Sequence, residues 1–176
     1  MRLADILPAY VPPLVRDREG LMREVRASWD ELDGVVRGLS DADFRRRVPG
    51  MGEGADTWTV KDVVAHLAAW RRNAERVAAL QSRRPSRRLN AFPGAVLGLR
   101  TGEFNAALLE RWQDRSIDEV LMEHRQSFRA LMSAVEALPV DRLLSRKRTV
   151  LWLTPVIGHP RSHLPDIRAA LAPSAS

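Results

Sequence analysis

Histidine carries the clearest chemical signal in this sequence. The chain has only four histidines, yet His159 and His163 stand four residues apart in the stretch "HPRSH". On an α-helix, residues at this spacing differ in direction by about 40° and in height by about 6 Å, so both imidazoles project from one face. A helical pair of this kind can ligate one metal ion.

His66 is the third candidate ligand. In "VKDVVAHLAAW" it shares a helical face with apolar residues that include Trp70, so we expect its ring to point inward. Neutral imidazoles from His66, His159 and His163 would leave open metal positions for water or substrate. The alternative is packing, because an inward-facing histidine is more often a hydrogen-bonded core residue than a ligand. We interpret His124, which has no partner at helical spacing, as structural or at most as a support for a ligand.

The elements that must position these residues are helices. Apolar residues recur at spacings of three and four in four segments, while only "RTVLWL" (Arg148–Leu153) resembles a strand. The pattern predicts one all-α domain over residues 1–176, an antiparallel four-helix bundle. A long connection, residues 83–102, follows the second helix, and "EFNAALLERWQ" (Glu103–Gln113) adds a short helix before the third.

Capping signals predict where three of the helices begin. Thr59 with Asp62, and Ser116 with Glu119, place a hydroxyl three residues before an acid, which is the spacing of a capping box. Thr154, followed by a proline in the first turn, suits the start of the last helix. Asp62 also lies one turn before the candidate ligand on the second helix, so it either caps that helix or orients the imidazole.

Composition limits the function classes. The chain has no cysteine, which excludes disulfides, thiolate ligands and cysteine nucleophiles, and no apolar run approaches the ~20 residues of a membrane span. The N-terminus makes a poor signal peptide, so we expect a cytoplasmic protein. The net charge is +6, but the basic runs lack interleaved aromatic residues, so we expect a solvated surface rather than nucleic-acid binding. Trp29, Trp112 and Trp152 add apolar surface from which we predict a homodimer.

Three stretches resemble a known group of proteins. "WTVKDVVAHLAAW" (Trp58–Trp70) is similar to the second-helix signature of the DinB-like four-helix bundles, especially the ClbS/DfsB branch and the N-terminal domain of mycothiol-dependent maleylpyruvate isomerases. The stretch Phe104–Pro139 resembles the ClbS/DfsB branch, and "HPRSHLPDIRAAL" (His159–Leu171) is similar to the last helix of the family. In metal-binding members one histidine comes from the second helix and two from the last, which here correspond to His66, His159 and His163.

The resemblance implies a chemistry as well as a fold. Some relatives use such a site to activate a low-molecular-weight thiol for transfer or isomerisation, and the ClbS/DfsB branch is associated with resistance to a DNA-alkylating metabolite. We therefore expect a metal-dependent thiol transferase or hydrolase that detoxifies a small electrophile, with Zn²⁺ or Ni²⁺ as the metal and Fe²⁺ less tightly bound. The alternative is a self-resistance protein that sequesters the electrophile without a catalytic metal.

Two prolines depart from the family pattern. Pro160 stands where relatives favour an aromatic residue, and Pro165 follows the second candidate ligand of the last helix. If that helix begins at Thr154, both prolines are interior and should kink it, because each removes a backbone hydrogen bond and clashes with the preceding turn. The kink would then turn His163 away from His159.

Overall fold

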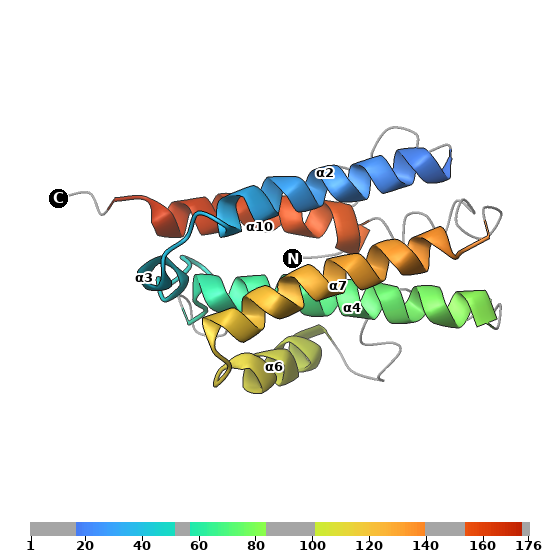
Figure 1. The fold of residues 1–176 in the computed structure, drawn as a ribbon. Coiled ribbons are helices and arrows are strands. Elements are labelled where there is room, and N and C mark those ends of the chain that lie inside the picture. The colour runs from blue at the N-terminus through green and yellow to red at the C-terminus, as the bar shows by residue number, and fades with distance from the viewer. Residues whose placement is uncertain (1–16, 52–56, 84–100, 140–153, 174–176) are drawn as a thin grey trace.

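Helices make up the described part of the protein, which in this computed structural model comprises residues 17–51, 57–83, 101–139 and 154–173. Four long helices form a bundle, with two shorter helices and one π-helical turn beside them (Figure 1). Their bounds are α2 (Arg18–Val36), α3 (Asp41–Phe44), α4 (Val60–Arg83), α6 (Thr101–Trp112), α7 (Ile117–Glu136), the π-helical turn (Thr154–Gly158) and α10 (His159–Leu171). The predicted all-α bundle is confirmed.

The long connection determines the directions of the helices. α4 and α7 pack along each other and run in the same direction (Figure 1). α2 and α10 also lie side by side and are parallel to each other, but they run in the direction opposite to that of α4 and α7. Two neighbouring parallel helices require a crossover, and residues 84–116, which include α6, provide it. The antiparallel contacts of the bundle are therefore those of α2 with α7 and of α4 with α10. This last contact brings the two histidine-bearing helices together.

The predicted capping boxes are present. The Asp62 carboxylate accepts a hydrogen bond from the Thr59 backbone nitrogen at 2.9 Å, and the Asp62 nitrogen donates to the Thr59 hydroxyl at 3.3 Å. Ser116 and Glu119 make the same reciprocal pair at the start of α7. These side chains satisfy backbone donors that the first helical turn leaves without partners.

Buried polar residues form a layer across the middle of the bundle, between two apolar clusters. One cluster draws on α2 up to Val25 and on α4 from Ala74, and the other on α2 from Leu32 and on α4 up to Leu67. On every long helix the residues between the clusters include buried or half-buried polar side chains. The polar layer comprises the buried residues Ser28, Asp33, His66, Arg71, Asn73, His124 and Ser127 and the half-buried His159 and His163.

The last helix begins later than the sequence predicts. Residues Thr154–Gly158 form a wide π-helical turn, and α10 starts only at His159. Pro160 consequently occupies the first α-helical turn, where its missing N–H has no intrahelical partner to lose. Pro165 is interior but exposed to solvent. The prediction that His163 turns away from His159 is wrong, because both histidines lie on one face of α10.

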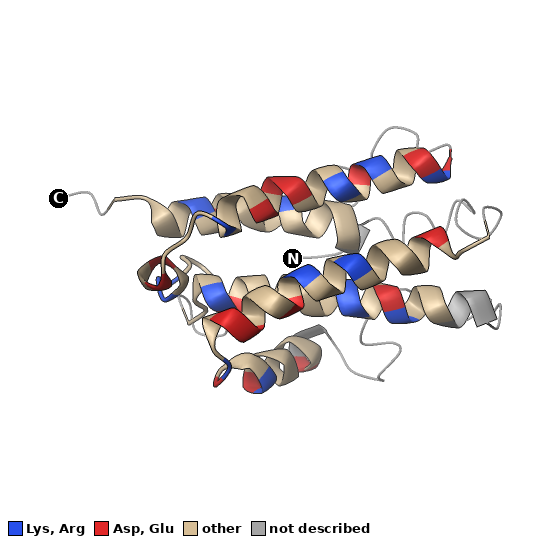
Figure 2. Cartoon of the chain, viewed as in Figure 1, with Lys and Arg blue, Asp and Glu red and all other residues tan. Residues whose placement is uncertain are grey.

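Charged residues on the outside are mixed in sign. Acidic and basic residues are interspersed along α2, α4 and α7 in Figure 2, and ion pairs join neighbouring helices. Arg72 contacts Glu123 of α7 at 2.7 Å. Among the described helices, none combines the length and the apolar character that a membrane span requires.

The apolar surface behind the dimer prediction is only partly accounted for. Trp29 is buried within the chain and Trp112 is half-buried, whereas Trp152 and the strand-like run Arg148–Leu153 lie outside the described residues. Dimerisation stays a prediction.

Candidate metal centre

His66 faces the interior of the bundle from the first half of α4. Its residue surface is 5% exposed, and its ring meets the rings of Trp58 and Trp70 edge-on, with centroids 5.0 and 5.9 Å away. His159 also packs against Trp70, at 4.9 Å between centroids. The two tryptophans therefore surround the imidazoles with apolar surface on the α4 side.

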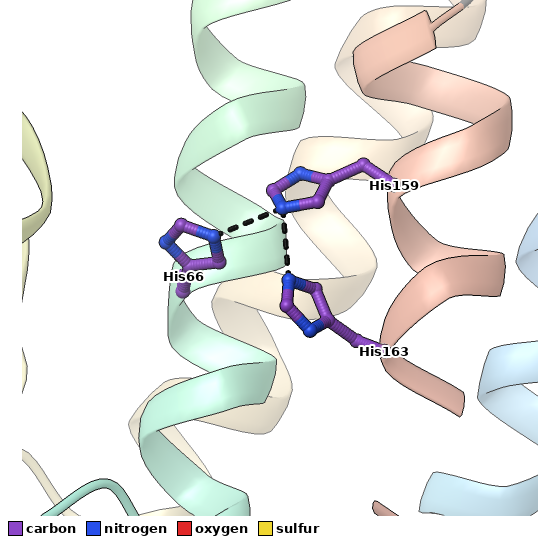
Figure 3. A group of neighbouring side chains, drawn as sticks. All are labelled: His66, His159 and His163. Atoms are coloured by element: carbon purple, nitrogen blue, oxygen red, sulfur yellow. Dashed lines mark hydrogen bonds between the residues drawn. The ribbon is translucent and has the colours of Figure 1, made fainter. Parts of the chain in front are cut away.

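The three predicted histidines converge on one point (Figure 3). The Nε2 atom of His159 lies 3.1 Å from Nε2 of His66 and 2.9 Å from Nε2 of His163. One ring nitrogen from each residue lies within 4.8 Å of the others. The i, i+4 pair of α10 and the inward histidine of α4 thus meet as the sequence predicts.

Neutral imidazoles cannot satisfy these contacts by themselves. The Asp166 carboxylate lies 3.0 Å from Nδ1 of His163 and can only accept, so that nitrogen carries the ring hydrogen and Nε2 of His163 is a bare lone pair. A hydrogen on Nε2 of His159 can be donated to Nε2 of His163 or to Nε2 of His66, but not to both with good geometry. One hydrogen is thus available for two short contacts, whereas a cation at the centre would satisfy all three lone pairs.

Burial keeps these histidines neutral. It lowers the pKa of His66 to about 3, with a smaller contribution from His163, and it holds the pKa of His159 well below the ordinary value. Burial also lowers the pKa of His163, against the opposing effect of Asp166. Because a histidine ligates a metal only in its neutral form, the lone pairs are available at neutral pH without the loss of protons.

The nitrogen separations suit a first-row divalent ion. With metal–imidazole bonds of about 2.0–2.1 Å, separations of 2.9 and 3.1 Å correspond to angles of roughly 90–100° at a shared ion. Such angles occur between neighbouring ligands in five- and six-coordinate sites, and a tetrahedral site would need the nitrogens about 3.4 Å apart. Two of the three separations therefore suit neighbouring ligands of one divalent ion, and all three ring nitrogens lie within 4.8 Å of one another.

The other polar candidates from the sequence have different roles. Asp62 binds the backbone and hydroxyl of Thr59, so it caps α4. His124 is fully buried and contacts Arg71 and Asp33 rather than the three-histidine centre.

Sequence reasoning missed Asp166, the acid that orients His163. Its signal was available, because residues three apart on a helix are neighbours, and a carboxylate is the usual partner of a ligating imidazole.

Comparison with known proteins places the chain in a family. The family model for the mycothiol maleylpyruvate isomerase N-terminal domain matches residues 25–164, which include all three histidines. Neither the curated proteins nor the solved structures gave a match. The finer resemblance to the ClbS/DfsB branch stays a prediction. The chain belongs to the mycothiol maleylpyruvate isomerase N-terminal domain family, one of the DinB-like four-helix bundles.

Proposed function

We propose that His66, His159 and His163 hold one divalent metal ion and that the protein is a metal-dependent enzyme acting on a small electrophile. The observation that carries the proposal is the convergence of three histidine ring nitrogens, with Nε2 of His159 lying 3.1 Å from that of His66 and 2.9 Å from that of His163. Imidazole ligands favour Zn²⁺ or Ni²⁺, with Fe²⁺ bound less tightly. The reaction class is attack by a thiol or a water on the electrophile, as in a thiol transferase or hydrolase.

The chain's own residues would hold and shield the reacting groups. Asp166 accepts the hydrogen of His163 Nδ1 and so keeps Nε2 directed at the centre. Trp58 and Trp70 cover the imidazoles on one side, which limits access of water and lowers the local dielectric constant. A divalent ion supplies Lewis acidity, which lowers the pKa of a thiol or water that reaches it.

The family supports a thiol as the nucleophile. Its description names a mycothiol-linked isomerase, and a thiol becomes a strong nucleophile once it loses its proton. The sequence contains no cysteine, so in this proposal the thiol is a bound molecule. The electrophile is a small compound, which a screen of thiol and electrophile pairs would identify.

Metal binding is tested by thermal unfolding with and without added Zn²⁺ or Ni²⁺. An ion that binds only the folded state at a hundredfold excess over Kd stabilises it by about 2.7 kcal/mol. For a chain of this size the melting temperature should rise by roughly 5–10 °C. His159→Ala should abolish the rise, whereas His124→Ala, the matched control, should retain it even if its own melting temperature is lower.

Two results would separate the alternatives. If neither metal raises the wild-type melting temperature above that of His159→Ala, the metal site is wrong, and a protein that sequesters its ligand without metal becomes the better hypothesis. If the metal binds, the loaded protein should catalyse conjugation or hydrolysis in a screen of thiol and electrophile pairs, and His159→Ala should be inactive. Metal binding without turnover in that screen would contradict the enzyme proposal alone.

A further inference from the structure

A small cavity between α4 and α6 brings His66 next to a residue that the metal proposal does not use. The cavity has a volume of about 10 Å³ and is lined by His66 and Asn105 together with, among others, Trp58, Asp62 and Leu108. This volume is close to the space that one water molecule requires.

Two of the residues that line this cavity have a buried polar atom without a partner. Nδ1 of His66 and Oδ1 of Asn105 are both buried, and neither has a hydrogen-bond partner among the described residues. A buried polar atom without a partner is costly, so native structures rarely leave one unpaired. Two such atoms on one cavity therefore call for a common explanation.

The two atoms are chemically complementary. When Nε2 of His66 presents its lone pair to the three-histidine centre, the ring hydrogen must be on Nδ1, which makes that atom a donor. Oδ1 of Asn105 is an acceptor. One water molecule has both an acceptor for the first atom and a donor for the second.

The helix that carries Asn105 is anchored to α4 on both sides of it. Phe104 packs edge-on against Trp70, with ring centroids 5.9 Å apart. Beyond the other end of α6, Lys61 Nζ donates to the carbonyl oxygens of Gln113 and Arg115 at 2.7 and 2.9 Å. These contacts keep the Asn105 amide at a fixed distance from His66.

We propose that Asn105 is a positioning residue: through one water in this cavity, its Oδ1 accepts the hydrogen bond of His66 Nδ1–H and keeps Nε2 directed at the centre. The inference rests on the proposed function only in its effect on metal binding. It gives His66 a support equivalent to the one that Asp166 gives His163, and it makes α6 part of the site.

The first test is metal affinity. Partners of ligating imidazoles typically contribute ten- to hundredfold to affinity, so Asn105→Leu should weaken Zn²⁺ or Ni²⁺ binding by about that factor. Asn105→Asp, which keeps an acceptor, should bind the metal at least as tightly as wild type. Leu108→Ala, a control on the same cavity, should stay within about threefold, because it changes packing but removes no acceptor.

The second test needs no metal. Nitrogen-15 NMR of the imidazole rings in the metal-free protein should show His66 as the Nδ1–H tautomer in wild type and in Asn105→Asp, and a shift towards Nε2–H in Asn105→Leu. An unchanged tautomer and unchanged affinity in Asn105→Leu would overturn the role of Asn105 while leaving the metal site standing. Failure of wild type to bind metal, with the tautomer change present, would overturn the metal proposal and leave this one standing.

Discussion

Two groups of buried histidines lie in the same polar layer, and their hydrogen bonds differ. In the first, the three-histidine centre, like atoms face one another and one hydrogen serves two contacts. In the second, which we call the arginine cluster (Arg71, His124, Asp33 and Ser127), the contacts pair a donor with an acceptor. Arg71 donates to Nδ1 of His124 at 2.6 Å and to the Ser127 hydroxyl at 3.2 Å. Nε2 of His124 then carries its hydrogen, and it lies 3.4 Å from Asp33 Oδ1 without a hydrogen bond to any described residue.

The pKa values do not distinguish the two groups. Burial is the main cause in both, and it lowers the pKa of His66 to about 3 and that of His124 to about 2. The two groups differ in whether a cation or hydrogen-bond donor of the chain faces the lone pair of the histidine. The arginine cluster contains its own cation, stacked over Trp29 at 4.9 Å, whereas the three-histidine centre lacks one. A buried histidine whose lone pair accepts a hydrogen bond from a cation of the same chain is structural, and one whose lone pair meets other lone pairs is a candidate ligand.

The largest effect should come from the arginine cluster. Arg71→Met removes the cation, and it leaves Asp33 buried with less compensation and His124 without its donor. We expect a loss of about 3–5 kcal/mol in the free energy of unfolding, measured by urea denaturation. The neighbouring Arg72→Met is the matched control, since Arg72 makes a partly exposed ion pair worth at most about 1 kcal/mol. Equal losses in the two variants would show that Arg71 is not buried as described.

Acid should destabilise the protein through His124. Its folded pKa lies below the unfolded value of about 6.5, owing to burial and then to Arg71 and Arg125, while Asp33 faces it from α2. The stability it contributes is therefore complete above about pH 6.5 and is lost as the pH falls, because only the unfolded chain takes up the proton. Between pH 6.5 and 5 this loss is about 1.6 kcal/mol. In urea denaturation, His124→Gln should lose less than wild type by that amount, and equal losses would contradict the prediction.

Asp166 should strengthen metal binding without being essential for it. Asp166→Asn replaces the carboxylate on His163 Nδ1 with a weaker, neutral acceptor, so we expect about tenfold weaker binding of Zn²⁺ or Ni²⁺ by titration. Asp62→Asn is the control on the other histidine-bearing helix. It should lower stability by about 1 kcal/mol through the capping box and leave affinity unchanged. Weaker metal binding in Asp62→Asn alone would reverse the roles assigned to these two acids.

The smallest effect has the opposite sign to the first. In the metal-free protein, His159→Leu removes a buried Nδ1 that lacks a partner among the described residues and ends the competition for one hydrogen. We expect the metal-free variant to gain about 1 kcal/mol in stability while it loses metal binding. Calorimetry in the presence of a chelator measures this. A loss of stability as large as that of Arg71→Met would mean that both clusters are structural.

Sequence reasoning succeeded where the deciding interactions are local. The capping boxes at Thr59 and Ser116 depend on residues three apart, and the pairing of His159 with His163 depends on one helical turn. It failed at the π-helical turn Thr154–Gly158. We attribute this failure to packing, since Ile157 is held through its carbonyl oxygen by the buried Ser28 hydroxyl of α2, and no local pattern reports such a contact.

The arginine cluster and Asn105 show two further kinds of omission. Arg71 follows Val64 by seven residues, so the helical period places it on the core-facing side of α4. Sequence reasoning overlooked this position because a charged residue is normally expected at the surface. Asp33, likewise, follows Trp29 by four. The position of Asn105 depends on how α6 docks on α4, a long-range contact after a long connection, and the sequence offers no local signal for it.

Arg161, between the two histidines of α10, has a kinetic consequence. Its guanidinium bridges Glu24 and Glu31, which lie two helical turns apart on α2, at 3.3 and 2.8 Å. α10 cannot slide along α2 by one turn without breaking both contacts, so the two imidazoles are already in register before any ion arrives. Ion capture should then require only the exchange of bound water and small ring rotations, and uptake should follow a single concentration-dependent phase without a slow rearrangement of the helices.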